Sequence, residues 1–231
     1  MMGIGVILKQ GAGLVPKKVP IHREGKIFQA IRWVRPEDIQ ESKYEKETMV
    51  ERKYLLEGHT SIEKEIISVV IPLFPKGGFK RISSVVFAGD LYSESIGKTI
   101  GLWDGSTVKI DSGLSSKDKY KVLIHELSHS MSMPGGSPNS EIRRRVLAVK
   151  SNWDKHAHKV SYRAGYYTYN ASKRREAYEK LSRARGTRPI SEYALSNSDE
   201  YWACSVEAFF TMPDKLRKLD PDTYKILGEI F

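Results

Sequence analysis

The chain has 231 residues, of which 40% are hydrophobic and 29% are charged, and its formal net charge is +10 at pH 7. These proportions are typical of a globular protein and exclude a disordered chain. The longest nearly uninterrupted apolar run, IISVVIPLF, is far too short to cross a bilayer. The single cysteine, Cys204, excludes an internal disulfide. No basic residues precede the apolar N-terminus, so we expect no secretory signal and a cytoplasmic protein, or one associated with a virion or released by another route.

The first sixty residues predict a small appendage. Residues 19–36 alternate apolar and polar side chains, which is typical of a β-hairpin, and a charged helix then extends to about Leu56. Because Gly58 can stop that helix, we place a domain boundary there. It separates an N-terminal hairpin and helix (1–58) from a second domain (59–231).

Local signals along the second domain predict a mixture of helices and strands. Thr60 and Glu63 have the spacing of a capping box ahead of an apolar helix. Residues 81–89 are β-branched and lie between turn residues, which favours a strand. Residues 98–111 form two alternating runs joined by Asp-Gly, the pattern of a hairpin with a type I′ turn.

The stretch KVLIHELSHSM lies on a predicted helix that starts with Ser115 and Asp118 at capping distance. Residues four apart share a helix face, so His125 and His129 can place two nitrogens on one zinc ion at about 2.0–2.1 Å. Glu126 lies one step around the helix, which suits a general base acting on zinc-bound water. The alternative is an ordinary core helix with satisfied histidines, but the preceding hairpin and the apolar neighbours favour the metal.

A catalytic zinc site needs a third protein ligand and one open position. In SNSDEYWACSVEAFF, aromatic residues form an apolar stripe at helical spacing, while Glu200, Cys204 and Glu207 line another face. A helix that buries this stripe could present Glu200 to the metal and hold Glu207 against a histidine, the alternative for both being a solvated face. His156 and His158 lie two apart on a basic helix, so we expect them to be exposed and not to share a metal.

HELSH and the downstream EYALSNSDEYWACSVEAFF together resemble the catalytic domain of anthrax lethal factor and the related Pro-Pro endopeptidases, which are gluzincins. In that family a tyrosine lies seven residues before the glutamate that completes the zinc site, and Tyr193 and Glu200 have that spacing. The resemblance implies a zincin-like fold and a zinc-dependent endopeptidase. It also implies His125, His129 and Glu200 as ligands, Glu126 as the base and Tyr193 as the donor that stabilises the oxyanion.

The sequence departs from this family in three ways. Cys204 stands where the second glutamate of the usual run is expected, and Glu207 arrives later, so Glu207 remains an alternative to Glu200 as the ligand. A serine replaces a common glycine inside the motif, and the stretch between the two motifs is long. The match covers roughly residues 82–231. Outside it, HREGKIFQAIRWVRP is weakly similar to an element of phage structural proteins, which hints at a phage or mobile-element origin.

The basic charge is concentrated in one segment. Between residues 141 and 189, Lys and Arg outnumber Asp and Glu by ten, which equals the net charge of the whole chain. We interpret this segment as an insertion of two or three helices. It is either a solvated helical hairpin or a surface that binds nucleic acid or an acidic protein partner.

Together these patterns predict an α+β domain with a small twisted sheet over the motif helix and a helical C-terminal half. We expect a zinc-dependent endopeptidase that acts on a protein or peptide substrate, with one strand of the 98–111 hairpin pairing with that substrate, and no membrane association. The alternative is a basic structural or nucleic-acid-associated protein, such as a virion component, with an inert metal site.

Overall fold

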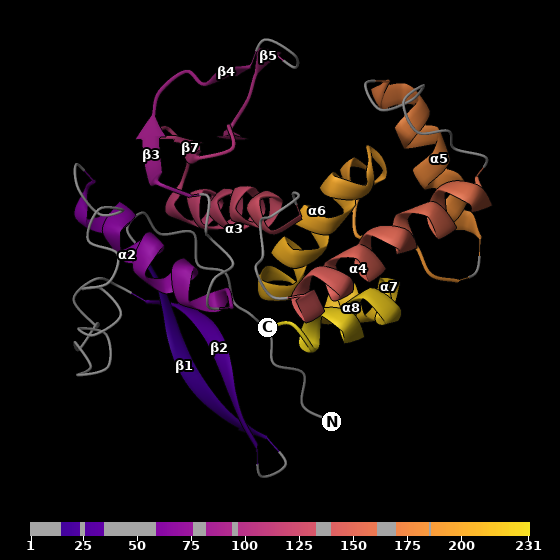
Figure 1. Cartoon of the computed structure of the whole chain (residues 1–231), viewed down its shortest axis with the longest axis horizontal. Helices are drawn as coiled ribbons and strands as arrows, with labels where there is room; N and C mark the ends of the chain where they lie inside the picture. The colour runs from indigo at the N-terminus through magenta and orange to yellow at the C-terminus, as the bar shows by residue number, and fades with distance from the viewer. Residues whose placement is uncertain are drawn as a thin grey trace.

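The computed structural model (Figure 1) describes the backbone of residues 15–23 and 26–34, and the chain at 59–75, 82–93, 97–132, 140–160, 170–184 and 186–231. Its described part is a mixed α+β structure that is mostly helical, in agreement with the predicted class. The charged helix predicted to end near Leu56 and most tyrosines of the basic segment lie outside these residues. The domain boundary predicted near Gly58 also lies there and stays a prediction.

Helices form most of the described chain. In order they are α2 (Ser61–Val70), the 3-10 helix η3 (Ile71–Leu73), α3 (Ser116–Ser132), α4 (Ser140–Lys159), α5 (Ala171–Arg183), the 3-10 helix η4 (Tyr193–Leu195), α6 (Ser198–Thr211), α7 (Pro213–Leu219) and α8 (Pro221–Gly228). The capping box predicted ahead of α2 is present, with the Thr60 N–H donating to the Glu63 carboxylate at 3.0 Å. The basic segment contributes α4 and α5. Among the described helices, none is both long and apolar enough to span a membrane.

A small sheet of three strands lies on one side of α3. Its order is β3 (Ser84–Ala88), β7 (Thr107–Asp111) and β6 (Gly101–Trp103), with β3 parallel and β6 antiparallel to β7. The predicted hairpin is therefore β6–β7, but the predicted type I′ turn is wrong. That turn needs positive φ at both central residues, whereas only Gly105 has it, at 99°. The Asp104 carboxylate instead accepts hydrogen bonds from the N–H groups of Ser106 and Thr107 at 3.1 and 2.8 Å.

Two antiparallel pairs complete the described strands. They are β1 (Val15–Arg23) with β2 (Lys26–Val34), and β4 (Tyr92–Ser93) with β5 (Gly97–Lys98). The register of β1 and β2 runs from Val15 opposite Val34 to Arg23 opposite Lys26, so the hairpin predicted near the N-terminus is confirmed. In Figure 1 this hairpin and the β4–β5 pair extend from opposite ends of the molecule.

The helix α3 lies between the β6–β7 hairpin and α6 (Figure 1). It begins as predicted, with the Asp118 N–H donating to the Ser115 hydroxyl at 3.2 Å. Leu123, Ile124 and Leu127 are fully buried. Each such side chain contributes about 1.5–3 kcal/mol when it leaves water. The apolar face of α3 therefore fixes the direction in which its histidines point.

Candidate metal centre

Two histidines of α3 direct their Nε2 atoms toward each other. His125 and His129 are one helical turn apart, and their Nε2 atoms are 3.3 Å from each other. The two rings lie nearly perpendicular, at 78°. Their side chains are 13% and 15% exposed, so the nitrogens meet in a largely water-free place. In a core helix with separately satisfied histidines, the two nitrogens would instead turn toward different partners.

The third predicted ligand comes from the first turn of α6. The Asn197 side chain caps this helix by accepting hydrogen bonds from the N–H groups of Asp199 and Glu200, both at 2.9 Å. Trp202 is fully buried, and its indole N–H donates to the Ser128 carbonyl of α3 at 2.7 Å. This bond joins the two helices two residues after Glu200, and so it fixes where that carboxylate lies.

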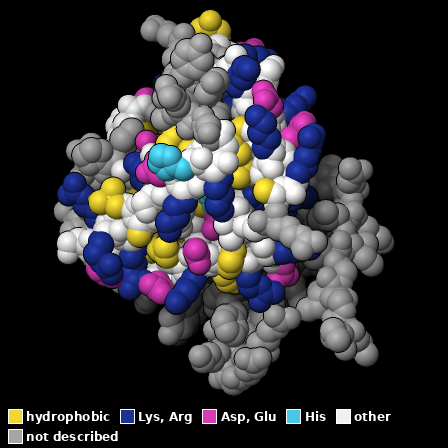
Figure 2. Space-filling model, turned by 90° about the vertical axis from the view of Figure 1, so that its right-hand side faces the viewer, with side chains coloured by type: hydrophobic (Ala, Val, Ile, Leu, Met, Phe, Trp, Pro, Cys, Tyr) yellow, Lys and Arg dark blue, Asp and Glu magenta, His cyan; other side chains and the backbone are white. Residues whose placement is uncertain are grey.

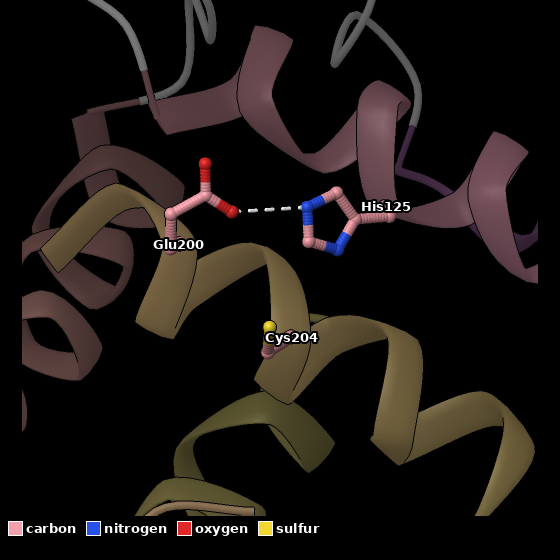
Figure 3. Close-up of side chains that lie close together, drawn as sticks. All are labelled: His125, Glu200 and Cys204. Carbon is pink, nitrogen blue, oxygen red and sulfur yellow. Dashed lines mark hydrogen bonds and ion pairs between the residues drawn. The ribbon is translucent and has the colours of Figure 1, made fainter. Parts of the chain in front are cut away.

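Glu200 points at the imidazole of His125 (Figure 3). Its Oε2 lies 3.1 Å from the Nε2 of His125 and 3.6 Å from the Nε2 of His129. With the 3.3 Å between the two nitrogens, three donor atoms form a nearly equilateral triangle. Tetrahedral zinc bonds of about 2.0–2.2 Å place neighbouring ligand atoms roughly 3.3–3.6 Å apart. The spacing of these three side chains therefore fits a zinc ion.

The electrostatics of the same group favour a cation. Burial alone would lower the pKa of His125, but hydrogen bonds with Cys204, Glu200 and Glu207 outweigh it and raise that pKa well above its ordinary value. Burial alone would raise the pKa of Glu200, but its contacts with His125 and His129 lower it. The acidic neighbours of His125 thus favour positive charge at its imidazole, and the two imidazoles keep Glu200 ionised, a combination that suits a bound cation.

Glu207 and Cys204 lie near the same imidazole. The Oε2 of Glu207 is 3.4 Å from Nδ1 of His125, the ring nitrogen that Glu200 does not use. Cys204, one turn after Glu200, offers a second donor set, since ligand atoms of His125, Glu200 and Cys204 lie within 4.8 Å of one another (Figure 3). Burial raises the pKa of this thiol, which opposes the thiolate form that binds metals. The set that contains His129 has the closer spacing.

Glu126 lies beneath β6 and is 9% exposed. Its carboxylate accepts a hydrogen bond from the backbone N–H of Trp103, and burial raises its pKa although the neighbouring imidazoles oppose the shift. The strand comes this close only because residue 101 is glycine. A Cβ on Gly101 would lie 2.5 Å from Oε1 of Glu126 and 2.5 Å from Cγ1 of Val122. The sequence reasoning missed this glycine, although a glycine inside a predicted strand signals close approach of another group.

Tyr193 lies on η4 with its ring 6.3 Å from the ring of His125, measured between centroids. The residue is partly open to solvent, at 47% exposed. Burial of the hydroxyl and the charge of Glu200 raise the pKa of Tyr193, so the hydroxyl stays protonated and can donate a hydrogen bond. The structure thus brings together all six residues that the sequence singled out at this site: His125, Glu126, His129, Tyr193, Glu200 and Glu207.

The prediction of an exposed His156 is wrong. Its residue is only 2% exposed, and its Nε2 lies 3.2 Å from the Asp220 carboxylate, which also accepts a hydrogen bond from the Tyr201 hydroxyl. His158 is exposed, as predicted. The partner of His156 is distant in the sequence, and the basic composition around His156 therefore gave no signal of its burial.

A family model described as glucose-regulated metallo-peptidase M90 matches residues 105–231, which is more than half of the chain. The matched stretch includes the whole of α3, η4 and α6. Neither the comparison with curated proteins nor that with solved structures gave a match, so the likeness to lethal factor and the phage origin stay predictions. Zinc is the usual cofactor of such peptidases, and the donor group around His125 is consistent with it. The chain belongs to the glucose-regulated metallo-peptidase M90 family and is therefore a metal-dependent hydrolase of protein or peptide substrates.

Proposed function

We propose that this metallopeptidase is a zinc endopeptidase in which His125, His129 and Glu200 hold the metal ion. The observation that carries the proposal is the triangle of donor atoms, with edges of 3.1, 3.3 and 3.6 Å. A zinc ion bound there supplies a Lewis acid that polarises a peptide carbonyl and lowers the pKa of a water molecule. Glu207, 3.4 Å from Nδ1 of His125, is proposed to fix the tautomer that leaves Nε2 free for the metal.

In this proposal two further side chains act on the substrate: one transfers a proton, and the other stabilises the negative charge that develops on the carbonyl oxygen. Glu126 takes the proton of the attacking water and passes it to the leaving amine, a role that its raised pKa supports. Tyr193 donates a hydrogen bond to the carbonyl oxygen as negative charge develops on it, and its own raised pKa keeps that proton in place. Glu126 adjoins His125 along α3, and Tyr193 lies beside the His125 ring, so both are close to the proposed metal.

The position of β6 supports cleavage within an extended chain. One edge of β6 pairs with β7, and no described strand pairs with its other edge. The Trp103 N–H of this strand contacts Glu126, so β6 runs beside the proposed base. A substrate that pairs with the free edge would place a peptide bond next to Glu126 and could extend past the site in both directions. We therefore propose an endopeptidase.

The proposal is tested by Glu126→Gln, measured with a diverse peptide library read by mass spectrometry. This change removes the base and keeps the size of the side chain. Zinc should stay near one equivalent per chain while the cleavage rate falls by about 100-fold or more. Glu179→Gln, an exposed position on α5, is the control and should cleave normally. A Glu126→Gln protein that cleaves at the wild-type rate would refute the assignment of the base.

The ligand assignment is tested by zinc analysis of three variants. Glu200→Ala should lose zinc because it removes one of the three close donor atoms. Glu207→Ala should keep most of the zinc, since its carboxylate meets the other nitrogen of His125. Cys204→Ser should keep the zinc as well. If Glu200→Ala keeps its zinc while Glu207→Ala or Cys204→Ser loses it, the third ligand is Glu207 or Cys204 and not Glu200.

A further inference from the structure

The second helix of the basic segment reaches the candidate site. On α5 the Arg174 guanidinium lies over the ring of Tyr193, 6.0 Å from its centroid. The next residue, Arg175, places its Nε 3.6 Å from the carboxylate of Glu192. Two consecutive arginines of α5 therefore contact two consecutive residues of the turn that presents the proposed oxyanion donor.

The Tyr193 side chain depends on such contacts more than its backbone does. The backbone of η4 is fixed by its neighbours, because Ala194 and Leu195 are fully buried and the Trp153 indole N–H donates to the Leu195 carbonyl at 3.1 Å. Tyr193 itself, in contrast, is 47% exposed as a residue. Holding a half-exposed side chain in one rotamer costs entropy, which contacts with Arg174 and with the imidazole of α3 can offset.

The helix α5 is itself fixed to the body of the molecule, so it can act as a support. Ala177 and Leu181 are buried in the core. The Arg188 guanidinium lies 5.7 Å from the ring centroid of Tyr178, and the backbone N–H of Arg188 donates to the Leu219 carbonyl at 2.9 Å. These contacts hold α5 against the segment that leads into η4.

Other basic side chains of α5 pair with glutamates of the same helix. Lys180 lies 2.9 Å from Glu176, and Arg183 lies 3.3 Å from Glu179. Figure 2 shows the side of the molecule that faces right in Figure 1, where acidic side chains lie among the basic ones. Arg174 and Arg175 differ from these basic residues, because they contact the turn around η4.

We propose that Arg174 is a positioning residue, which holds the Tyr193 ring so that its hydroxyl meets the developing oxyanion. This inference rests on the proposed function, in which Tyr193 is the donor. It gives the basic segment a role in the peptidase reaction, because α5 contacts the turn that presents Tyr193. The Arg175–Glu192 pair supports the same turn from the adjacent position.

Kinetics of Arg174→Ala test the proposed role. Because Arg174 acts through a transition-state donor, kcat should fall roughly 2- to 30-fold, with KM and zinc content nearly unchanged. Arg174→Lys should restore part of the loss. In a Tyr193→Phe background, Arg174→Ala should cause no further loss. Arg183→Ala, on the same helix but paired with Glu179, is the matched control. An equal loss in both backgrounds would overturn the proposal.

A measurement on the metal-free protein tests the contact without activity. A 3-fluorotyrosine placed at position 193 should give a fluorine resonance away from that of an exposed tyrosine. Arg174→Ala should move it toward the exposed value and narrow it, and Arg183→Ala should not. An unchanged resonance in Arg174→Ala overturns the positioning role. If the resonance moves but Tyr193→Phe cleaves like wild type, the contact is real while the donor role of Tyr193, and with it this inference, is wrong. A zinc-loaded wild type without peptidase activity would instead refute the proposed function.

Discussion

The close approach of Gly101 in β6 to α3 gives the most direct test of how the fold positions the proposed base, Glu126. In Gly101→Ala the new methyl would lie 2.5 Å from Oε1 of Glu126 and 2.5 Å from Cγ1 of Val122, whereas ordinary contact begins at 3.4 Å. Val122 is 8% exposed on a packed helix, so its methyl cannot move alone. The strand or the Glu126 carboxyl must therefore shift by about 1 Å.

The expected effects on stability and on catalysis differ in size. Over-packing of this kind costs about 1–3 kcal/mol, and each kcal/mol lowers Tm by about 2–4 °C in a chain of this length. A displacement of about 1 Å at a reacting group costs on the order of 100-fold in rate. Gly101→Ala should therefore remain folded at 25 °C and lose about 100-fold in kcat. Its zinc content should stay normal, because the new methyl meets Glu126 and Val122 rather than the imidazoles.

The assay combines thermal unfolding, zinc analysis and kcat on one peptide taken from the library screen. Gly89→Ala is the matched control, since its Cβ would lie 3.9 Å from the Ser112 hydroxyl, an ordinary contact. A Gly101→Ala protein with a lowered Tm and a normal kcat would show that β6 does not set the position of Glu126. Loss of zinc would show that the displacement extends to the histidines, which would contradict the expectation that only Glu126 and Val122 are affected.

Two further predictions concern buried charges. Lys119→Met should destabilise the protein by about 3 kcal/mol in urea unfolding. In the wild type the Glu63 carboxylate is 7% exposed and lies 3.0 Å from the Lys119 ammonium, and the substitution leaves it without a cation. Lys180→Met breaks an exposed ion pair and should have little effect, so equal losses of stability in the two variants would contradict this prediction. Burial would raise the pKa of Asp220, but hydrogen bonds from His156 and a tyrosine hold it below its ordinary value. This ionised carboxylate stabilises the fold above about pH 4 and loses that contribution as pH falls through its lower folded pKa. The stability difference between wild type and Asp220→Asn should therefore shrink below pH 4, and a constant difference would refute the linkage.

Local signals predicted the helices well because their causes are local. The capping residues Thr60 and Ser115 act on N–H groups within three residues, and each helix begins where its cap predicts. The parallel pairing of β3 with β7 was not predictable in this way, since it joins strands that are separated by the β4–β5 pair and β6. The turn between β6 and β7 differed because the Asp104 side chain satisfies the turn N–H groups and only Gly105 needs positive φ.

The same distinction between local and long-range causes applies to the candidate site. Helical spacing alone places His125 and His129 on one face, and the structure brings their Nε2 atoms within 3.3 Å. Spacing could not choose between Glu200 and Glu207, because both lie on one face of α6. Which imidazole nitrogen each carboxylate meets depends on how α6 packs on α3, and that packing is fixed by the buried indole of Trp202. The resemblance to a known family supplied the preference that periodicity lacked.

Two carboxyl groups of the candidate site, Glu200 and Glu126, have pKa values shifted in opposite directions, because their surroundings differ. Glu200 lies in the first turn of α6, where the helix dipole favours an anion, and its contacts with the histidines lower its pKa. Glu126 lies in the middle of α3, away from either helix end, and burial raises its pKa. A metal ligand must stay ionised, whereas a general base must take up and release a proton near neutral pH. The opposite shifts of these two carboxyls therefore favour the roles proposed for them, Glu200 as a ligand and Glu126 as the base, over the reverse assignment.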